Sequence, residues 1–240
     1  MITEERKKEL RDNYLRICER VENACAKYNR SGVTLLAASK TKPAEDIVYL
    51  AEECGMKLCG ENHAQEFRDK YEAVTAAGAR MDFIGHLQSN KIKYVAGKAG
   101  LIHSVDSIQI AGEINSFCEK RGIKQDILVE VNVGDELSKT GLSKNNLGEF
   151  MENIANFSSL NLCGMMAMTP FCEKTTENRK YFAESYRIFL DFFDKTPHNK
   201  REVVLSMGMS DSFEEAIAEG STIVRVGSSI FGARNYGTLL

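Results

Sequence analysis

The segment VTLLAASKTKP, residues 33–43, predicts a buried β-strand followed by a short loop and a helix. Its apolar run, residues 33–38, is a short series of β-branched and aliphatic side chains, which is typical of a strand. Pro43 biases the residue before it away from helical geometry and suits the first turn of the next helix. Lys40 therefore falls at the carboxyl end of the strand, where parallel α/β proteins bind their ligands.

Lys40 has two interpretations. A lysine at the end of a strand most often extends into solvent, and the segment alone favours that ordinary role. In a ligand site, partial burial would lower the pKa of the ammonium group, and the neutral amine could attack an aldehyde to form a Schiff base. The rest of the chain favours this second interpretation.

Strands and helices alternate along the remainder of the 240-residue chain. After a helix near the N-terminus, strands are expected at residues 33–38, 57–59, 81–84, 101–103, 126–133, 160–166, 202–205 and 222–226. Such alternation predicts a parallel sheet with helices outside it. Eight units in a chain of this length predict a single (β/α)8 TIM-type barrel domain over residues 1–240, with residues 1–30 as an extra N-terminal helix. No GxGxxG turn follows the first strand, which disfavours a dinucleotide-binding sheet.

Composition narrows the class of protein. A net charge of −3, with 43% hydrophobic and 27% charged residues, is ordinary for a globular protein and gives no reason to expect nucleic-acid binding. No apolar run is long enough to cross a bilayer, and the charged N-terminus lacks the apolar segment of a secretory signal, so we expect a cytoplasmic protein. The seven cysteines and four histidines lack metal-binding spacing, so no metal site is expected.

Two loops are predicted to meet at one end of the barrel, after the seventh and eighth strands. Barrel enzymes often bind phosphate between these loops and a short extra helix. Gly227 would allow close backbone approach, and Ser210 and Ser228 would supply hydroxyl groups. Taken singly, Ser210 could merely cap the next helix and Gly227 could merely form a turn. Both loops together favour a phosphate site.

Arg225 and Asn62 complete the set of candidate residues. Arg225 ends the last strand, where its side chain could face the barrel mouth. A lysine, an anion site and a partner for a pyridine nitrogen are what pyridoxal phosphate requires. A fixed cation there opposes protonation of the nitrogen and makes the ring a weaker electron sink. Asn62, after the second strand, could cap the following helix or bind a ligand. Ser89, Asp106 and Ser107 are expected to cap other helices.

Seven segments carry a resemblance that covers nearly the whole chain. They are SKT at 39–41, GEN at 60–62, IGHLQSNK at 84–91, HSVDS at 103–107, VNV at 131–133, KTG at 139–141 and LSMGMSDSFEEAIAEGSTIVRVGSSIFG at 205–232. With these motifs the chain resembles the pyridoxal phosphate homeostasis protein family, single-domain relatives of the N-terminal barrel of alanine racemase.

The resemblance implies both a cofactor and the residues that hold it. It implies an aldimine between pyridoxal 5'-phosphate and Lys40, phosphate contacts from Ser210, Gly227 and Ser228, Arg225 facing the pyridine nitrogen, and Asn62 beside the ring. Two places depart from the family pattern. His63 stands where tyrosine is common, and Met81-Asp82 stands where an aromatic residue and a histidine are usual.

The expected function is that of a monomeric binding protein that carries or buffers pyridoxal phosphate, with apo-enzymes that use this cofactor as possible recipients. Racemases of the alanine racemase type have a second, β-rich domain that supplies a catalytic tyrosine, and the chain ends soon after the predicted barrel closes. Two alternatives stay open. One is an amino-acid racemase or related enzyme that uses Lys40. The other is an isomerase of a phosphorylated sugar, which would not explain Lys40, Asn62 and Arg225 together.

Overall fold

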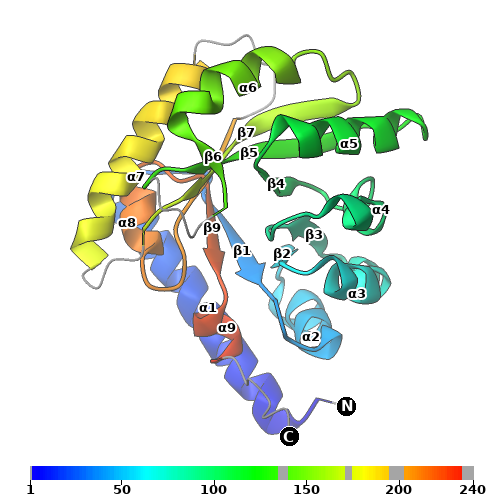
Figure 1. The fold of residues 1–240 in the computed structure, drawn as a ribbon. Coiled ribbons are helices and arrows are strands. Elements are labelled where there is room, and N and C mark those ends of the chain that lie inside the picture. Colours follow the sequence, from blue (N-terminus) through cyan, green and yellow to red (C-terminus); the bar gives the residue numbers. More distant parts are fainter. Residues whose placement is uncertain (1, 135–139, 171–174, 195–202, 234–240) are drawn as a thin grey trace, which may run out of the picture.

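Eight parallel strands of the computed structural model close into a barrel with helices around it (Figure 1). The structure describes residues 2–134, 140–170, 175–194 and 203–233. The barrel strands are β1 Thr34–Ala38, β2 Leu58–Glu61, β3 Arg80–Phe83, β4 Ile102–Val105, β5 Gln125–Asn132, β7 Leu160–Met168, β8 Val204–Ser206 and β9 Ile223–Val226. Pairing of β1 with β9 and of β4 with β5 closes the sheet. The predicted (β/α)8 fold is confirmed.

One strand was not predicted. β6, Leu142–Ser143, pairs in parallel with the carboxyl end of β5, between two of the strands expected from the sequence. Two residues are too few to show the alternation that identifies a strand. The neighbouring Lys139 of the KTG motif lies outside the described residues.

The helices cover the outer face of the barrel. They are α1 Glu4–Lys27, α2 Ala44–Cys54, α3 Ala64–Ala76, α4 Ile92–Val95, α5 Ile108–Glu119, α6 Leu147–Ile154, α7 Thr175–Phe189, α8 Phe213–Ala218 and α9 Ser228–Phe231. Short 3-10 turns at Ser89–Lys91 and Lys144–Asn146 precede α4 and α6, and a π-helical turn, Leu190–Asp194, follows α7.

Two helix ends agree with what the sequence favours, and two do not. Gly55 ends α2 with φ +73°, a left-handed geometry that glycine adopts without penalty. Ser107 caps α5, because its side chain accepts a hydrogen bond from the N–H of Ile110. Two expectations are wrong. Ser89 is the first residue of a 3-10 turn rather than a cap, and Asp106 pairs with His86 instead of capping α5.

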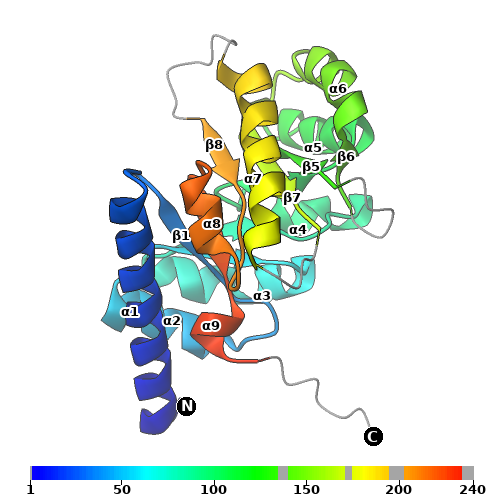
Figure 2. The ribbon, with the colours of Figure 1, turned by 90° about the vertical axis from the view of Figure 1, so that its left-hand side faces the viewer.

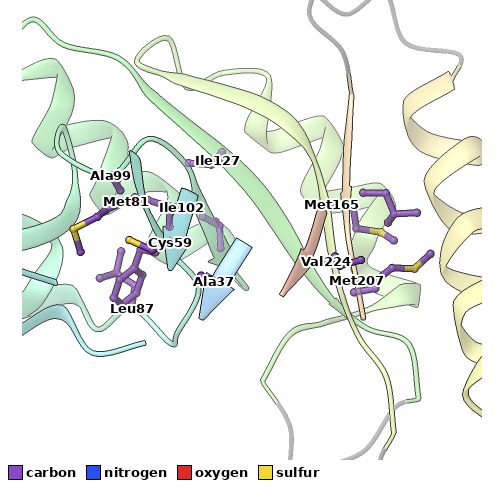
Figure 3. Packing of buried hydrophobic residues seen from close by; sticks show 14 of the residues in the cluster. Ala37, Cys59, Met81, Leu87, Ala99, Ile102, Ile127, Met165, Met207 and Val224 are labelled. Carbon is purple, nitrogen blue, oxygen red and sulfur yellow. The ribbon is translucent and has the colours of Figure 1, made fainter. Parts of the chain in front are cut away.

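Both faces of the sheet are buried, as expected for strands that run parallel inside a barrel. Side chains that alternate along the strands divide into two sets. One set packs inside the barrel and comprises Leu36, Leu58, Leu101, Leu128, Met166 and Ile223. The other packs beneath the helices and includes Ala37, Cys59, Ile102 and Val224 (Figure 3). Apolar packing on both faces of the sheet therefore stabilises the closed barrel.

The N-terminal helix α1 packs along the outside of the barrel against α2, α8 and α9 (Figures 1 and 2). It begins after Thr3, whose side chain accepts a hydrogen bond from the N–H of Arg6. The face toward the barrel carries Leu10, Ile17 and Val21, and burying a side chain of this size contributes roughly 1.5–3 kcal/mol. In the part of the chain that the structure describes, no helix has the length and apolar character needed to cross a membrane.

Candidate functional site

A cavity of about 330 Å³ opens at the carboxyl ends of the barrel strands. This volume suits a small ligand. All six residues singled out from the sequence line it, namely Lys40, Asn62, Ser210, Arg225, Gly227 and Ser228. The wall is completed mainly by apolar side chains, among them Ile84, Met166 and Met168. The structure therefore brings together residues from loops that are up to 188 positions apart (228 minus 40).

Lys40 lies in a tight turn directly after β1. The turn covers residues 39–42 and is closed by a hydrogen bond of 3.1 Å from the N–H of Lys42 to the carbonyl of Ser39. Ser39 also donates its N–H to the carbonyl of Gly60 at 2.9 Å, which ties the turn to β2. Thr41 has φ +64°, a left-handed conformation that is rare for a β-branched residue. The backbone on both sides of Lys40 is thus strongly constrained.

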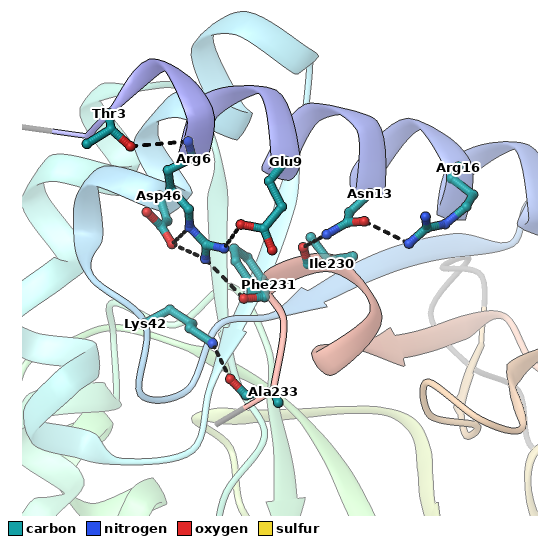
Figure 4. Close-up of polar contacts among 10 residues, drawn as sticks. All are labelled: Thr3, Arg6, Glu9, Asn13, Arg16, Lys42, Asp46, Ile230, Phe231 and Ala233. Carbon is teal, nitrogen blue, oxygen red and sulfur yellow. Dashed lines mark hydrogen bonds and ion pairs between the residues drawn. The ribbon is translucent and has the colours of Figure 1, made fainter. Parts of the chain in front are cut away.

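Lys42 is a second lysine at the cavity. Its Nζ donates a hydrogen bond of 3.0 Å to the carbonyl of Ala233 (Figure 4). Burial, together with the nearby charge of Arg6, lowers the pKa of Lys42 below its ordinary value. Because two lysines line one cavity, any covalent chemistry there must be assigned to Lys40 or Lys42 by direct mapping.

The loops after β8 and β9 form one unit. The hydroxyl of Ser210 accepts a hydrogen bond of 3.2 Å from the N–H of Gly227, at the start of α9. Ser210 does not cap α8, which Ser212 precedes, so the alternative of a simple helix cap is wrong. A Cβ on Gly227 would lie 2.9 Å from the carbonyl oxygen of Ala38, so glycine permits this close approach to β1. The first turn of α9 adds N–H groups without intrahelical partners, which suit an anion.

Helix α1 holds α9 in place from the far end (Figure 4). Arg6 donates to the carbonyl oxygen of Phe231 at 3.0 Å, and Asn13 donates to that of Ile230 at 3.1 Å. Arg6 is in turn paired with Asp46 at 2.6 Å. Carbonyl groups at a helix end need such partners. The extra N-terminal helix therefore fixes the short helix that borders the candidate anion site.

Asn62 carries an unused acceptor. Its Oδ1 is buried and has no hydrogen-bond partner among the described residues. His63, not Asn62, precedes α3, so the capping alternative for Asn62 is wrong. A Cβ on Gly85 would overlap the backbone of Asn62, which explains why glycine stands there. Leaving an acceptor buried and unpaired costs about 1–3 kcal/mol, which a ligand that donates a hydrogen bond would recover.

Arg225 is buried in β9, with only 7% of its surface exposed. Its Nη1 donates to both the carbonyl and the hydroxyl oxygen of Ser206, each at 2.8 Å. Burial lowers the pKa of Arg225 to about 10, against the opposing charge of Glu130, so the guanidinium remains a cation at neutral pH. The side chain is therefore a fixed positive charge on the wall of the cavity.

Buried polar side chains continue from Arg225 across the barrel. Since Arg225 donates to the Ser206 hydroxyl, that hydroxyl is free to donate to Nδ1 of His103, 3.1 Å away. Nε2 of His103 then donates to Asp82 at 3.1 Å, and Arg80 also donates to this carboxylate. Burial lowers the pKa of His103, which favours the neutral ring. Sequence reasoning missed this network, although polar residues inside three buried strands were a signal.

His86 and Asp106 lie after neighbouring strands and pair with each other at 3.1 Å. Neither is among the residues that line the cavity. Within the described ranges, no three histidine, cysteine, aspartate or glutamate side chains are grouped so that they could hold a metal ion.

Comparison with known proteins places the chain in a family. The alanine racemase N-terminal domain family matches residues 7–235. A pyridoxal phosphate homeostasis protein of Aquifex aeolicus is 42% identical over 223 residues, which cover 92% of this chain and 96% of the relative. The chain belongs to the pyridoxal phosphate homeostasis protein family. Its relative of the same name in Escherichia coli K12 is 36% identical over 230 residues, covering 93% and 96% of the two chains.

Solved structures share the barrel of this family member. PipY of Synechococcus elongatus, in a structure with PLP bound, aligns with a TM-score of 0.80 and 26% identity, covering 93% of this chain and all of that one. An alanine racemase of Clostridium difficile aligns with a TM-score of 0.71 at 15% identity, covering 96% of this chain and 61% of that one, which shows a common fold.

Proposed function

We propose that the protein binds pyridoxal 5'-phosphate in this cavity and acts in cofactor homeostasis as a carrier or buffer. The observation that carries the proposal is the convergence of an amine, an anion site and a fixed cation on one cavity, supplied by Lys40, Ser210 with Ser228, and Arg225. The names of the family's relatives and the PLP-bound structure of PipY support the same ligand.

The residues present fit this cofactor chemically. Gly227 lets the loop after β9 pack closely against Ala38 at the cavity wall, and the hydroxyls of Ser210 and Ser228 suit phosphate oxygens. The buried Oδ1 of Asn62, which accepts no hydrogen bond within the described part of the chain, suits a donor on the ligand's ring substituents. When bound, pyridoxal phosphate would supply an aldehyde and an electron-withdrawing ring.

Lys40 is the residue we assign to covalent attachment. Its amine nitrogen would attack the aldehyde carbon, a C=N bond would form and the aldehyde oxygen would leave as water. Arg225, as a cation on the cavity wall, would disfavour a proton on the pyridine nitrogen through repulsion of like charges. A ring without that proton is a poor electron sink, which suits holding the cofactor more than transforming amino acids.

The recipients in this proposal are apo-enzymes that require pyridoxal phosphate, and the protein acts as a cytoplasmic monomer. A direct test loads the protein with pyridoxal phosphate, removes unbound cofactor and adds an apo-enzyme that needs it. We expect the apo-enzyme to recover activity faster than the loaded protein releases free cofactor when it is diluted without the apo-enzyme. A protein that retains its cofactor under these conditions would contradict the carrier role.

The alternative is an amino-acid racemase or a related enzyme with the same cofactor. The observation that supports this alternative is the fold shared with alanine racemase. Incubation of the loaded protein with a panel of L-amino acids separates the two functions. Formation of D-amino acids that disappears in Lys40→Ala would favour the enzyme, whereas the proposed carrier produces none.

A further inference from the structure

The turn that carries Lys40 is bound by a cluster of two buried charged side chains and one partly buried one that the proposed function does not use. We call Lys70, Glu61 and Glu66 the charged brace. Glu61 is completely buried in β2, and Lys70 on α3 is 8% exposed. Burying charges is costly, so a buried lysine paired with two carboxylates needs a reason beyond packing.

The first part of the brace grips the residue before Lys40. The hydroxyl of Ser39 donates to Oε1 of Glu61 at 2.6 Å. Nζ of Lys70 donates to the same oxygen at 2.8 Å and to the carbonyl of Ser39 at 3.3 Å. Both the side chain and the backbone of Ser39 are therefore fixed by groups that reach them from β2 and α3.

The second part grips the residue after Lys40. The N–H of Thr41 donates to Oε2 of Glu66 at 2.8 Å, and Lys70 donates to that same oxygen at 2.8 Å. His63 contacts the other oxygen, with Nδ1 at 2.9 Å. Burial alone would raise the pKa of Glu66, but the hydrogen bonds from Lys70, His63 and Thr41 outweigh it and lower the pKa to about 2. Glu66 is thus an anion at neutral pH.

The brace acts on a strained backbone. Thr41 has φ +64°, and a β-branched residue does not keep this conformation without help from its surroundings. Glu66 accepts the N–H of Thr41, while Lys70 holds both Glu66 and the carbonyl of Ser39. Lys70 therefore connects the two sides of the turn, because it contacts Ser39 directly and Thr41 through Glu66.

We propose that Lys70 and Glu66 are positioning residues that fix the turn at residues 39–42 so that the amine of Lys40 meets the aldehyde of a bound pyridoxal phosphate. This inference rests on the proposed function, since it concerns how the covalent bond is reached. Misplacement of a reacting group slows a reaction without weakening the contacts that hold the rest of the ligand. The brace therefore governs attachment to Lys40 and leaves the phosphate and ring contacts unchanged.

The test compares two quantities in matched variants. The first is the rate at which the absorption band of the covalent adduct forms with pyridoxal 5'-phosphate. The second is the affinity for pyridoxine 5'-phosphate, which has an alcohol in place of the aldehyde and cannot form the adduct. Lys70→Met is paired with the conservative Lys70→Arg. Glu66→Ala is paired with Glu66→Gln, which keeps an oxygen that can accept the N–H of Thr41.

We expect Lys70→Met and Glu66→Ala to form the adduct about tenfold more slowly or worse, with unchanged affinity for pyridoxine 5'-phosphate. Lys70→Arg and Glu66→Gln should recover most of the rate. Wild-type rates in Lys70→Met and Glu66→Ala would overturn the inference, and so would an equal loss of affinity for the alcohol, because that marks a general distortion. If Lys70→Met does not fold, the Glu66 pair decides.

Failure of the proposed function gives a different result. In that case the wild-type protein itself forms no adduct on Lys40, whatever residue stands at positions 66 and 70. An adduct that forms normally in the wild type and in Lys70→Met leaves the proposed function intact and removes only the role of the brace.

Discussion

Replacement of Asn62 by leucine should stabilise the protein without cofactor and weaken its binding of pyridoxal phosphate. The two side chains have similar shape, and Oδ1 of Asn62 is a buried acceptor to which none of the described residues donates a hydrogen bond. Removing such an acceptor recovers a cost of about 1–3 kcal/mol. For a chain of this size, each kcal/mol shifts the melting temperature by roughly 2–4 °C, so Asn62→Leu should melt several degrees higher.

The same change removes a contact that the ligand would use. A neutral hydrogen bond contributes about 0.5–1.5 kcal/mol, so the dissociation constant of pyridoxal phosphate should rise by a factor of roughly 2–10. Thermal melts with and without cofactor and a spectroscopic titration measure both effects. Together they give a variant that is more stable when empty and gains less stability from the ligand.

Asn115→Leu is the matched control. Asn115 is also buried, but its Oδ1 accepts the N–H of Ser159 at 2.9 Å. Leucine there leaves that N–H unpaired, so the melting temperature should fall and cofactor affinity should stay the same. If Asn62→Leu instead loses stability as Asn115→Leu does and binds the cofactor normally, Asn62 has an ordinary structural role and our reasoning about it is wrong.

Three further predictions concern other parts of the site. Gly227→Ala places a Cβ 2.9 Å from the carbonyl oxygen of Ala38. This overpacking should lower the free energy of unfolding by about 1–3 kcal/mol and should also lower cofactor affinity. Gly148→Ala, with open space around the added Cβ, should do neither. Arg225→Glu should shift the pyridine nitrogen of bound cofactor toward its protonated form, and an unchanged pH dependence of the absorption spectrum would count against Arg225 as its neighbour. The pKa of Glu66 is lowered from 4.5 to about 2, so its contribution to stability is complete above pH 4.5 and is lost as the pH falls toward 2. The free energy of unfolding of Glu66→Gln should therefore depend less on pH across that interval. Identical plots of unfolding free energy against pH for the wild type and Glu66→Gln would refute the shift.

The barrel could be predicted because its strands are buried on both faces and alternate regularly with helices. β5, Gln125–Asn132, and β7, Leu160–Met168, appear in the sequence as segments in which apolar residues predominate. β6, Leu142–Ser143, could not be found, since it exists only through its pairing with β5. The local pattern of apolar residues identifies strands that are long enough to show it, and misses a short strand that is defined by pairing with a neighbouring strand.

That the six candidate residues line one cavity could be predicted because strand ends in a parallel barrel share one face. Their supports depend on contacts across the chain. The hydrogen bond between Ser210 and Gly227 and the contact of His103 with Ser206 join residues that nothing in the local sequence connects. Lys70 did leave a signal, because it falls at helical spacing between the buried Phe67 and Val74 on α3.

The most direct test of the account is to identify the lysine that binds the cofactor. Purified protein is incubated with pyridoxal 5'-phosphate, its absorption spectrum is recorded, the adduct is reduced with borohydride, and the labelled peptide is mapped. We predict a visible band that is lost on reduction and a stable label on Lys40, with no band in Lys40→Ala. A protein that gains no band, or a label that maps to Lys42, would contradict the central claim.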